Sequence, residues 1–394
     1  MIKNFSKLDN FVNKLFLAVL SIYIFSFTMS RSVLFNNNPT FHFIVAYAIK
    51  LCLVLILMTT FYHIVTFEFT VKYTILFIVL GLLILANYYF TREGAILLIF
   101  CFTICAKNYN PDKLFKLIFF AFTISFFFVL FCRIINVMPD VESFESVRGN
   151  GVVRHSLGFA TPNVSAYYIT AFSIMYMNYK REKLAIYDFI FLLVFSIVLY
   201  KFSDTKNGLF ASILAIILGL ICRYVKTGLF LGLLEKFSVC SFAFAAIIPF
   251  LLTHLYVLFP SKLGSLNGML SGRLGLQEKA FDKFGVTVIG QRIIYNVNEY
   301  DKVDSSIVDL LLTYGIIAFV LVIAFFTYEA YLACKLKNKW LCMCFIVVAY
   351  YGIFESSILT LIFNPFSLYF FDNVFKCFPE AYIKVIGREV VKVM

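Results

Sequence analysis

Apolar runs of membrane-spanning length recur along most of this chain and are separated by short polar segments. A run of roughly 17–25 apolar residues is what an α-helix needs to cross the hydrocarbon core of a bilayer. The chain has 394 residues, of which 62% are hydrophobic and 14% charged, so a soluble fold could not bury its apolar surface. The sequence therefore predicts an all-α polytopic membrane protein.

The runs predict about twelve transmembrane helices within a single integral membrane domain covering residues 1–394. Lysines precede the first run and no small-residue cleavage site follows it, so that run is interpreted as a retained span. The predicted spans are 13–30, 42–62, 71–90, 94–107, 114–136, 163–179, 185–201, 207–223, 237–259, 306–330, 340–356 and 358–373.

The distribution of basic residues predicts an orientation, because cytoplasmic loops collect Lys and Arg. With both termini in the cytoplasm, the short connections rich in lysine fall inside, and the two longest loops, 137–162 and 260–305, fall outside. Short helices are expected in these outer loops. The net charge of +12 is then mainly a topological signal and does not require a nucleic-acid partner.

Arginines are concentrated on the predicted outer side, which holds seven of the ten. The planar arginine fork suits bidentate contact with phosphate or carboxylate. The distribution predicts an outward-facing cluster that binds an anionic headgroup or a diphosphate, although chance and loop length would also explain it. The seven are Arg31, Arg92, Arg133, Arg148, Arg154, Arg273 and Arg292.

The first outer loop contains RGNGVVRHSLGFATPN, a polar segment in which candidate site residues gather. Arg148 and Arg154 could clamp a diphosphate, His155 could bind a sugar or carry a proton, and Asn163 begins the next apolar run. The alternative is an ordered cap on the helix ends, in which the arginines pair with Asp140, Glu142 and Glu145.

The second outer loop predicts an amphipathic helix from Gly272 to Phe284 that lies along the membrane surface. Arg273 stands at its start. Asp304 precedes the next span, where it could act as a general base or simply cap the helix that begins near Ser305. Arg292 lies in the same loop.

Several chemistries are disfavoured. No nucleotide-binding loop of the Gly-Lys-Thr type is present. The ten cysteines fall almost entirely in apolar runs, which argues against a disulfide framework. Cys342 and Cys344 have no partner ligands nearby, so no metal site is expected there, and no cofactor is predicted.

Four segments resemble motifs of Wzy-type polysaccharide polymerases, within the O-antigen ligase and polymerase superfamily. SLGFATPNVSAYY resembles its R-x-SLGF-x-HPN pattern, and SGRLGLQEKAFDKFG followed by VIGQ resembles its GR…G outer loop. DSSIVDLLLTYGII resembles the entry to the following helix, and SDTKNGLFASIL resembles a T-x-SRG segment. Glu355 stands where that family tends to carry a Glu. The similarity covers residues 130–365, through short motifs in a shared order.

This resemblance implies a GT-C-like glycosyltransferase in the bacterial cytoplasmic membrane, which joins polyprenyl-pyrophosphate-linked oligosaccharide units at the outer face. A carboxylate or histidine would deprotonate the acceptor hydroxyl, and arginines would stabilise the departing pyrophosphate in place of a metal. Asp304, His155, Arg273 and Arg154 would be catalytic. Substrate and pyrophosphate would be bound by Arg148, Arg154, Asn163, Arg273, Arg292, Lys206 and Glu355. The implied partners are the donor and acceptor glycolipids, membrane lipids and a chain-length regulator protein.

The sequence also departs from the family pattern. Thr161 stands in place of the His before Pro-Asn, and Lys206 roughly replaces the Arg of the SRG triplet. Asp304-Ser305-Ser306 lacks the His of ligase relatives, which favours a polymerase over a ligase. A lipid-linked oligosaccharide flippase or transporter is the alternative from another class, but it would favour repeats and polar residues within the spans. The choice of base between Asp304 and His155 stays open.

Overall fold

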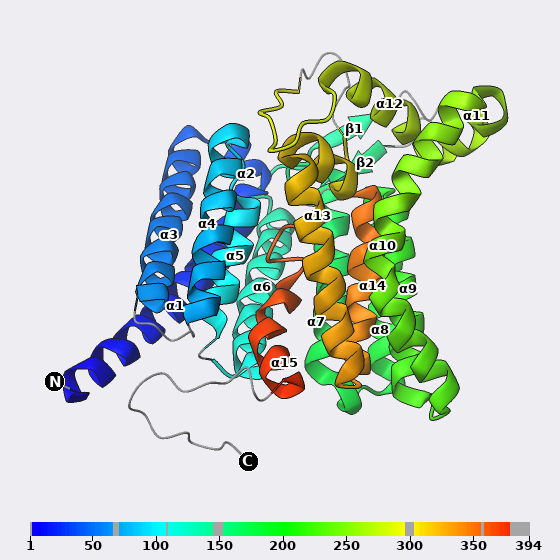
Figure 1. Cartoon of the computed structure of the whole chain (residues 1–394). Coiled ribbons are helices and arrows are strands. Elements are labelled where there is room, and N and C mark those ends of the chain that lie inside the picture. The colour runs from blue at the N-terminus through cyan, green and yellow to red at the C-terminus, as the bar shows by residue number, and fades with distance from the viewer. Residues whose placement is uncertain are drawn as a thin grey trace.

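A computed structural model describes residues 2–65, 71–107, 109–144, 153–295, 303–355 and 358–378. Figure 1 shows a bundle of long helices with short elements gathered at one end. The helices are α1 (Ile2–Ser30), α2 (Val33–Asn37), α3 (Pro39–Val65), α4 (Val71–Thr91), α5 (Ala95–Ala106), α6 (Pro111–Ile134), α7 (Pro162–Lys180), α8 (Ile186–Ser203), α9 (Lys206–Tyr224), α10 (Gly228–Leu258), α11 (Pro260–Met269), α12 (Arg273–Phe284), α13 (Ser306–Lys335), α14 (Lys339–Phe354) and α15 (Phe370–Cys377).

Two three-residue strands and two 3₁₀ turns complete the described structure. The strands β1 (Glu142–Phe144) and β2 (Val153–His155) pair antiparallel, with Ser143 opposite Arg154. The 3₁₀ turns are η2 (Arg181–Lys183) and η4 (Pro365–Tyr369).

In the described part of the chain, seven helices are long and apolar enough to cross a membrane: α1, α3, α6, α8, α9, α10 and α13. Large apolar side chains on their outer surfaces are exposed, for example Ile124 at 64% and Ile190 at 55%. Such an apolar surface is stable in contact with lipid, whereas its exposure to water would cost free energy. The chain is therefore a multi-pass membrane protein.

The predicted spans up to residue 356 all coincide with helices. However, α5, α14 and the described apolar part of α4, Ile75–Thr91, are shorter than the seven. Twelve crossings and a GT-C-like fold therefore stay predictions.

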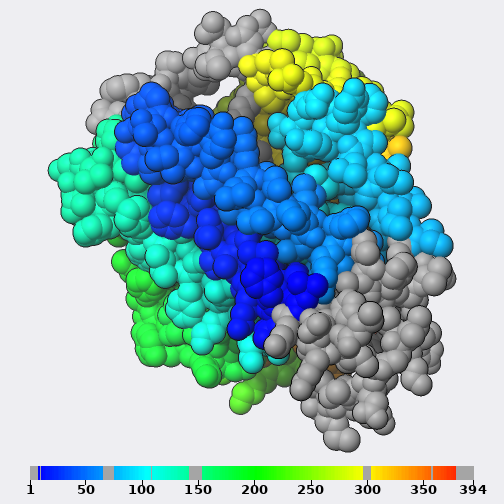
Figure 2. All heavy atoms as spheres, turned by 90° about the vertical axis from the view of Figure 1, so that its left-hand side faces the viewer, coloured from blue at the N-terminus to red at the C-terminus, as the bar shows by residue number. Residues whose placement is uncertain are grey.

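The bundle has two distinct ends (Figure 1). The end with β1, β2, α11 and α12, here called the loop end, includes the described parts of both predicted outer loops. The other end, here called the lysine-rich end, includes the connections 107–110, 181–185, 225–227 and 336–338. Figure 2 shows α3 and α4 on one side of the bundle.

The prediction of a helix over 358–373 is wrong. Residues 358–364 form turns, followed by η4 and the short helix α15. Pro365 has no amide proton and cannot continue a helix from the preceding turn. The segment still passes through the bundle, since Glu355 lies at the loop end while Tyr369 donates to Asp112 (3.0 Å) at the lysine-rich end. Nearly all of its described side chains are buried, as non-helical backbone at membrane depth requires.

The core centres on α14, which packs against α7, α9, α10 and α13 and is buried along most of its length. Local sequence fixes where several helices begin. Asn110 caps α6 by accepting from the Lys113 amide (3.1 Å), with Pro111 as the first helical residue. Asn338 caps α14 through the Leu341 amide (3.2 Å). Asparagine at the cap and proline just after it are both favourable placements.

Candidate functional site

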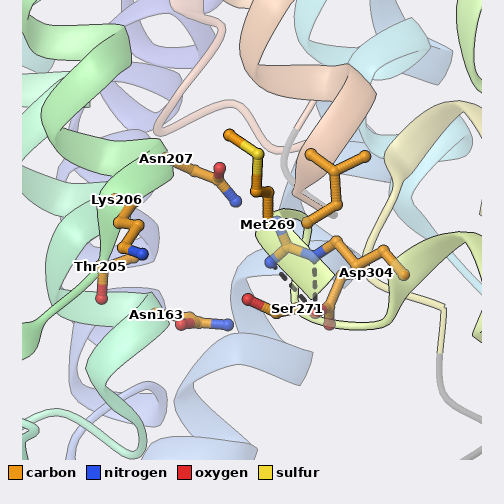
Figure 3. Close-up of a pocket in the computed structure, with 9 residues that line it drawn as sticks. Asn163, Thr205, Lys206, Asn207, Met269, Ser271 and Asp304 are labelled. Atoms are coloured by element: carbon orange, nitrogen blue, oxygen red, sulfur yellow. Dashed lines mark hydrogen bonds and ion pairs between the residues drawn. The ribbon is translucent and has the colours of Figure 1, made fainter. Parts of the chain in front are cut away.

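A pocket of about 100 Å³ opens at the loop end of the bundle. Figure 3 shows Asn163, Thr205, Lys206 and Asn207 on one side of it, facing Met269, Ser271 and Asp304 on the other. Leu270 and Arg273 also line the pocket. The lining residues come from four separate stretches of the chain, which only the fold brings together.

The N-terminal ends of four helices meet at this pocket. Asn163 is the second residue of α7, Lys206 is the first of α9, and Arg273 is the first of α12. Asp304 lies two residues before α13 begins at Ser306. Each helix N-terminus presents amide N–H groups without intrahelical acceptors and carries partial positive charge. Convergent N-termini make a pocket that favours an anion.

The four ends differ in how their amides are satisfied. Ser305 caps α13, and the Asn267 carboxamide oxygen accepts from the Leu274 amide of α12 (3.0 Å). The cap residues of α7 and α9, Thr161 and Thr205, make no side-chain cap hydrogen bond in the described structure. In the first turn of α7, Pro162 has no N–H and the Val164 amide donates to the Thr161 carbonyl (3.1 Å). The described amides left for a ligand are therefore those of Asn163 in α7 and of Lys206 and Asn207 in α9.

Arg273 bridges two carboxylates beside the pocket. Its Nη2 donates to Glu355 Oε1 (2.8 Å) and to Asp304 Oδ2 (3.2 Å). The Arg273 and Glu355 side chains are 11% and 9% exposed, whereas Asp304 is 34% exposed. Asp304 does not cap α13, because Ser305 holds that position. Of the two carboxylates, Asp304 is therefore the one open to the pocket.

Glu355 supports Arg273 from behind the pocket wall. Its Oε1 also accepts from Asn207 Nδ2 (3.2 Å). Burial raises the pKa of the Glu355 carboxyl; Arg273 and Asn207 oppose this effect, and the nearby charge of Asp304 adds to it. Two carboxylates therefore share one guanidinium here.

Lys206 adds a second cation to the pocket. Its side chain is exposed, and no described carboxylate pairs with it. A lysine at a helix N-terminus is placed unfavourably against the helix dipole by about 0.3–1 kcal/mol. A bound anion would remove that penalty.

Arg154 lies behind the side of the pocket that Asn163 and Thr205 form. It is 5% exposed and donates from Nε to the Ser203 carbonyl (2.9 Å) and from Nη2 to Asn163 Oδ1 (2.8 Å) and Thr205 Oγ1 (3.0 Å). These bonds tie β2 to the starts of α7 and α9. Arg154 therefore orients two pocket residues and does not itself line the pocket.

His155 lies apart from the pocket, because successive side chains of a strand point to opposite faces. Its Nδ1 is 2.7 Å from Asp140 Oδ2, and Arg133 Nη2 is 3.6 Å from the same oxygen. Partial burial acts to raise the pKa of Asp140, but hydrogen bonds from His155, Leu157 and Ser156, together with the charge of Arg133, lower it below its ordinary value. Asp140 thus pairs with His155 and Arg133. The alternative for the loop expected Arg148 and Arg154 to pair with its carboxylates and stays a prediction, because Arg148 and Glu145 lie outside the described residues.

Among the described residues, the other predicted outer arginines do not line the pocket. Arg148 lies outside the described residues, and Arg292 is exposed in the stretch after α12 without lining the pocket. Arg31 and Arg92 lie 5.0 Å from the ring centroids of Phe27 and Tyr89. The described outer arginines therefore do not form one cluster.

The apolar face of α12 packs against protein, which differs from the prediction of a helix lying on the membrane surface. Ala280 is buried together with Val308 and Leu312 of α13, with Phe281 packed alongside. This packing fixes the direction of α12 and brings Arg273 to the pocket.

Sequence reasoning missed several pocket residues. Thr205 and Asn207 flank Lys206 within a segment that carried a family resemblance, and that proximity was the available signal. Met269, Leu270 and Ser271 gave no signal. Met269 ends α11, and Leu270 and Ser271 lie in the turn that leads to α12, whose path depends on tertiary packing.

Within the described residues, no group of three or more His, Cys, Asp or Glu side chains is arranged to hold a metal ion. Comparisons with known protein families, characterised proteins and solved structures give no match to this chain.

Proposed function

We propose that this protein is a membrane glycosyltransferase that polymerises polyprenyl-pyrophosphate-linked oligosaccharide units, with the loop end at the outer face of the bacterial cytoplasmic membrane. The observation that carries the proposal is the convergence of four helix N-termini on one pocket, together with Lys206 and Arg273. Such a pocket suits a diphosphate, the leaving group of this reaction. The motif resemblance supplies the substrate class.

In the proposed reaction, the pyrophosphate of the donor lies against the starts of α7 and α9 and the Lys206 ammonium. An acceptor sugar hydroxyl attacks the anomeric carbon of the donor while the bond from that carbon to the pyrophosphate oxygen breaks. Asp304 takes the hydroxyl proton, and the polyprenyl pyrophosphate leaves with its charge stabilised by these cations and amides. Glu355 keeps Arg273 in place beside Asp304.

The structure supports Asp304 over His155 as the base. Asp304 lines the pocket, whereas His155 pairs with Asp140 on the other face of β2. Proton abstraction requires hydrogen-bond reach to the reacting hydroxyl, which a side chain outside the pocket lacks.

The test is polymer formation by the purified protein in lipid vesicles containing lipid-linked repeat units. Lys206→Gln and Arg273→Ala should each reduce polymer at least tenfold per folded protein, and Lys201→Gln is the matched control, since Lys201 is also an exposed lysine near the end of α8 but does not line the pocket. Unchanged polymer in both pocket variants would refute the proposal.

A gene deletion separates the neighbouring functions. A surface-glycan ladder that collapses to single units supports a polymerase. Full-length polymer retained on its lipid carrier would indicate a ligase, and units held on the cytoplasmic side would indicate a flippase.

A further inference from the structure

Helix α13 is interrupted at Gly315, whose backbone (φ 82°, ψ 174°) is not helical. The interruption leaves a short outer helix, Ser306–Tyr314, separated by a kink from the rest of α13. The amide groups of Ile316 and Ile317 donate outside the helix, to the carbonyls of Thr287 (2.9 Å) and Val288 (3.1 Å). The stretch after α12 thus accepts the hydrogen bonds that the interruption frees.

The same stretch also satisfies the carbonyls at the end of the outer helix. The Gln291 amide donates to the Thr313 carbonyl (2.9 Å), and Gln291 Nε2 donates to the Leu312 carbonyl (3.1 Å). Gln291 Nε2 is also 3.1 Å from the carbonyls of Phe284 and Gly285, where α12 ends. One carboxamide therefore ties the C-terminal ends of α12 and of the outer helix to each other.

Close backbone contact makes glycine necessary on both sides of this junction. A Cβ on Gly315 would lie 2.5 Å from the Gly290 nitrogen, and a Cβ on Gly290 would lie 2.8 Å from the Thr313 carbonyl oxygen. Both glycines have positive φ, a region that side chains disfavour. The fit is too close for the stretch to slide along α13.

Helix α4 joins the junction through Asn87. Asn87 Nδ2 donates to the carbonyls of Ile289 and Tyr314, the latter at 2.7 Å. Asn87 and Thr91 are buried, whereas most described side chains of α4 are exposed. A buried amide in an otherwise apolar helix is a costly placement that a specific contact explains.

The junction has a direct geometric relation to the pocket. At their N-terminal ends, α12 and the outer helix bring Arg273 and Asp304 within 3.2 Å. At their C-terminal ends, Gln291 ties them, and Ala280, Val308 and Leu312 pack between. The two helices thus lie side by side in the same direction, fixed at both ends.

We infer that Gln291 and Asn87 are positioning residues, which act through the interruption in α13 to hold Asp304 and Arg273 in their places at the pocket. This inference rests on the proposed transferase function. Neither residue lines the pocket, so each acts through the helices it joins. A displacement of about 1 Å at a reacting group can cost on the order of 10²-fold in rate.

The test uses the full chain in detergent–lipid micelles and compares Gln291→Glu and Asn87→Leu with wild type. Gln291→Glu keeps the size of the side chain but removes both amide donors. Gln277→Glu is the matched control. Gln277 is a glutamine of α12, more buried than the half-buried Gln291, and it accepts a hydrogen bond from Thr253 (2.7 Å), which a carboxylate retains.

Two readouts are measured per folded protein. Amide hydrogen exchange in peptides covering 273–284 and 303–314 should accelerate at least tenfold in both variants, with α7 and α9 unchanged. In the polymerisation assay, kcat should fall 10- to 100-fold while KM for the lipid-linked donor changes less than threefold. The double variant should be no slower than the slower single variant, since both substitutions open one junction.

Unchanged exchange in 303–314 overturns the inference whatever the activity. Faster exchange with unchanged kcat, or rate losses that multiply in the double variant, also overturns it. Absence of any transfer by the wild-type protein, with the exchange result as expected, instead refutes the proposed function on which the positioning role depends.

Discussion

Replacing Arg273 with methionine tests the charge balance that holds the pocket together. The substitution keeps much of the side-chain volume but leaves Glu355, 9% exposed, without the guanidinium 2.8 Å away. Removing one partner of a buried ion pair lowers the unfolding free energy by about 3–5 kcal/mol. Loss of the second, more exposed contact, between Arg273 and Asp304, lowers it by about 1 kcal/mol or less. Asn207 retains one hydrogen bond to Glu355, so the expected loss of unfolding free energy is about 3 kcal/mol near neutral pH.

The loss should depend on pH in a defined direction. Burial already raises the pKa of Glu355, and without Arg273 the pKa rises further. A carboxyl whose pKa is higher in the folded state than in the unfolded state binds protons more tightly when folded. The variant should therefore recover stability as the pH falls from neutral toward the ordinary carboxyl value of about 4.3.

The assay is denaturant-induced unfolding in mixed micelles, followed by fluorescence of Trp340. It is the chain's single tryptophan, buried far from the pocket, where it donates to Glu182 (2.9 Å) at the lysine-rich end. Adding Glu355→Gln to Arg273→Met removes the unpaired charge and should restore most of the lost stability. Lys206→Gln, at an exposed and unpaired position, is the control. A loss below about 1 kcal/mol in Arg273→Met, or a double variant less stable than the single, would refute the reasoning.

Three further outcomes are expected. Asp140→Asn should lower the unfolding free energy near neutral pH and make it depend less on pH in the acid range. The lowered pKa of Asp140 contributes stability that is present above the unfolded-state pKa and is lost as the pH falls. Unfolding curves between about pH 3 and 7 check this. Gly315→Ala should cost about 1–3 kcal/mol from its positive φ and a 2.5 Å contact, while Gly264→Ala, with open space around its Cβ position, should leave the unfolding midpoint nearly unchanged. Asp304→Asn should reduce polymer per folded protein by about 10²-fold or more with little change in unfolding, and normal polymer yield would remove Asp304 as the base.

The helical architecture could be predicted because apolar runs of bilayer length leave few alternatives to helices. The predicted span 71–90 corresponds to α4, Val71–Thr91, and 306–330 begins where α13 begins. The error at 358–373 has a physical cause: hydropathy reports burial, and this segment is buried inside protein without being helical. Composition alone does not distinguish a membrane-spanning helix from a non-helical segment that is buried inside the protein.

The site was predictable where local chemistry was unusual. Arg273 was predicted as the first residue of an amphipathic helix, Asp304 as a carboxylate just ahead of a span, and Lys206 through the family resemblance. The structure places all three at the pocket. That Arg154 faces the pocket wall and His155 faces away could be predicted only by knowing that both lie on a β-strand, because neighbouring side chains of a strand point to opposite faces. The contact of Gln291 with Leu312 joins residues 21 positions apart, and the Asn87 contact with Tyr314 joins residues 227 apart. Such pairings depend on tertiary structure.

The passage from Ile358 to Tyr369, which contains turns and one 3₁₀ helix, has a consequence for biogenesis. Such a segment satisfies only part of its backbone internally, so it cannot partition into lipid as an independent unit, since each exposed backbone group would cost several kcal/mol. It can enter only a preformed groove, lined in part by Phe115 and Tyr167, which lie on helices synthesised long before it. Insertion of this part of the chain is therefore a late event that waits for assembly of the preceding helices.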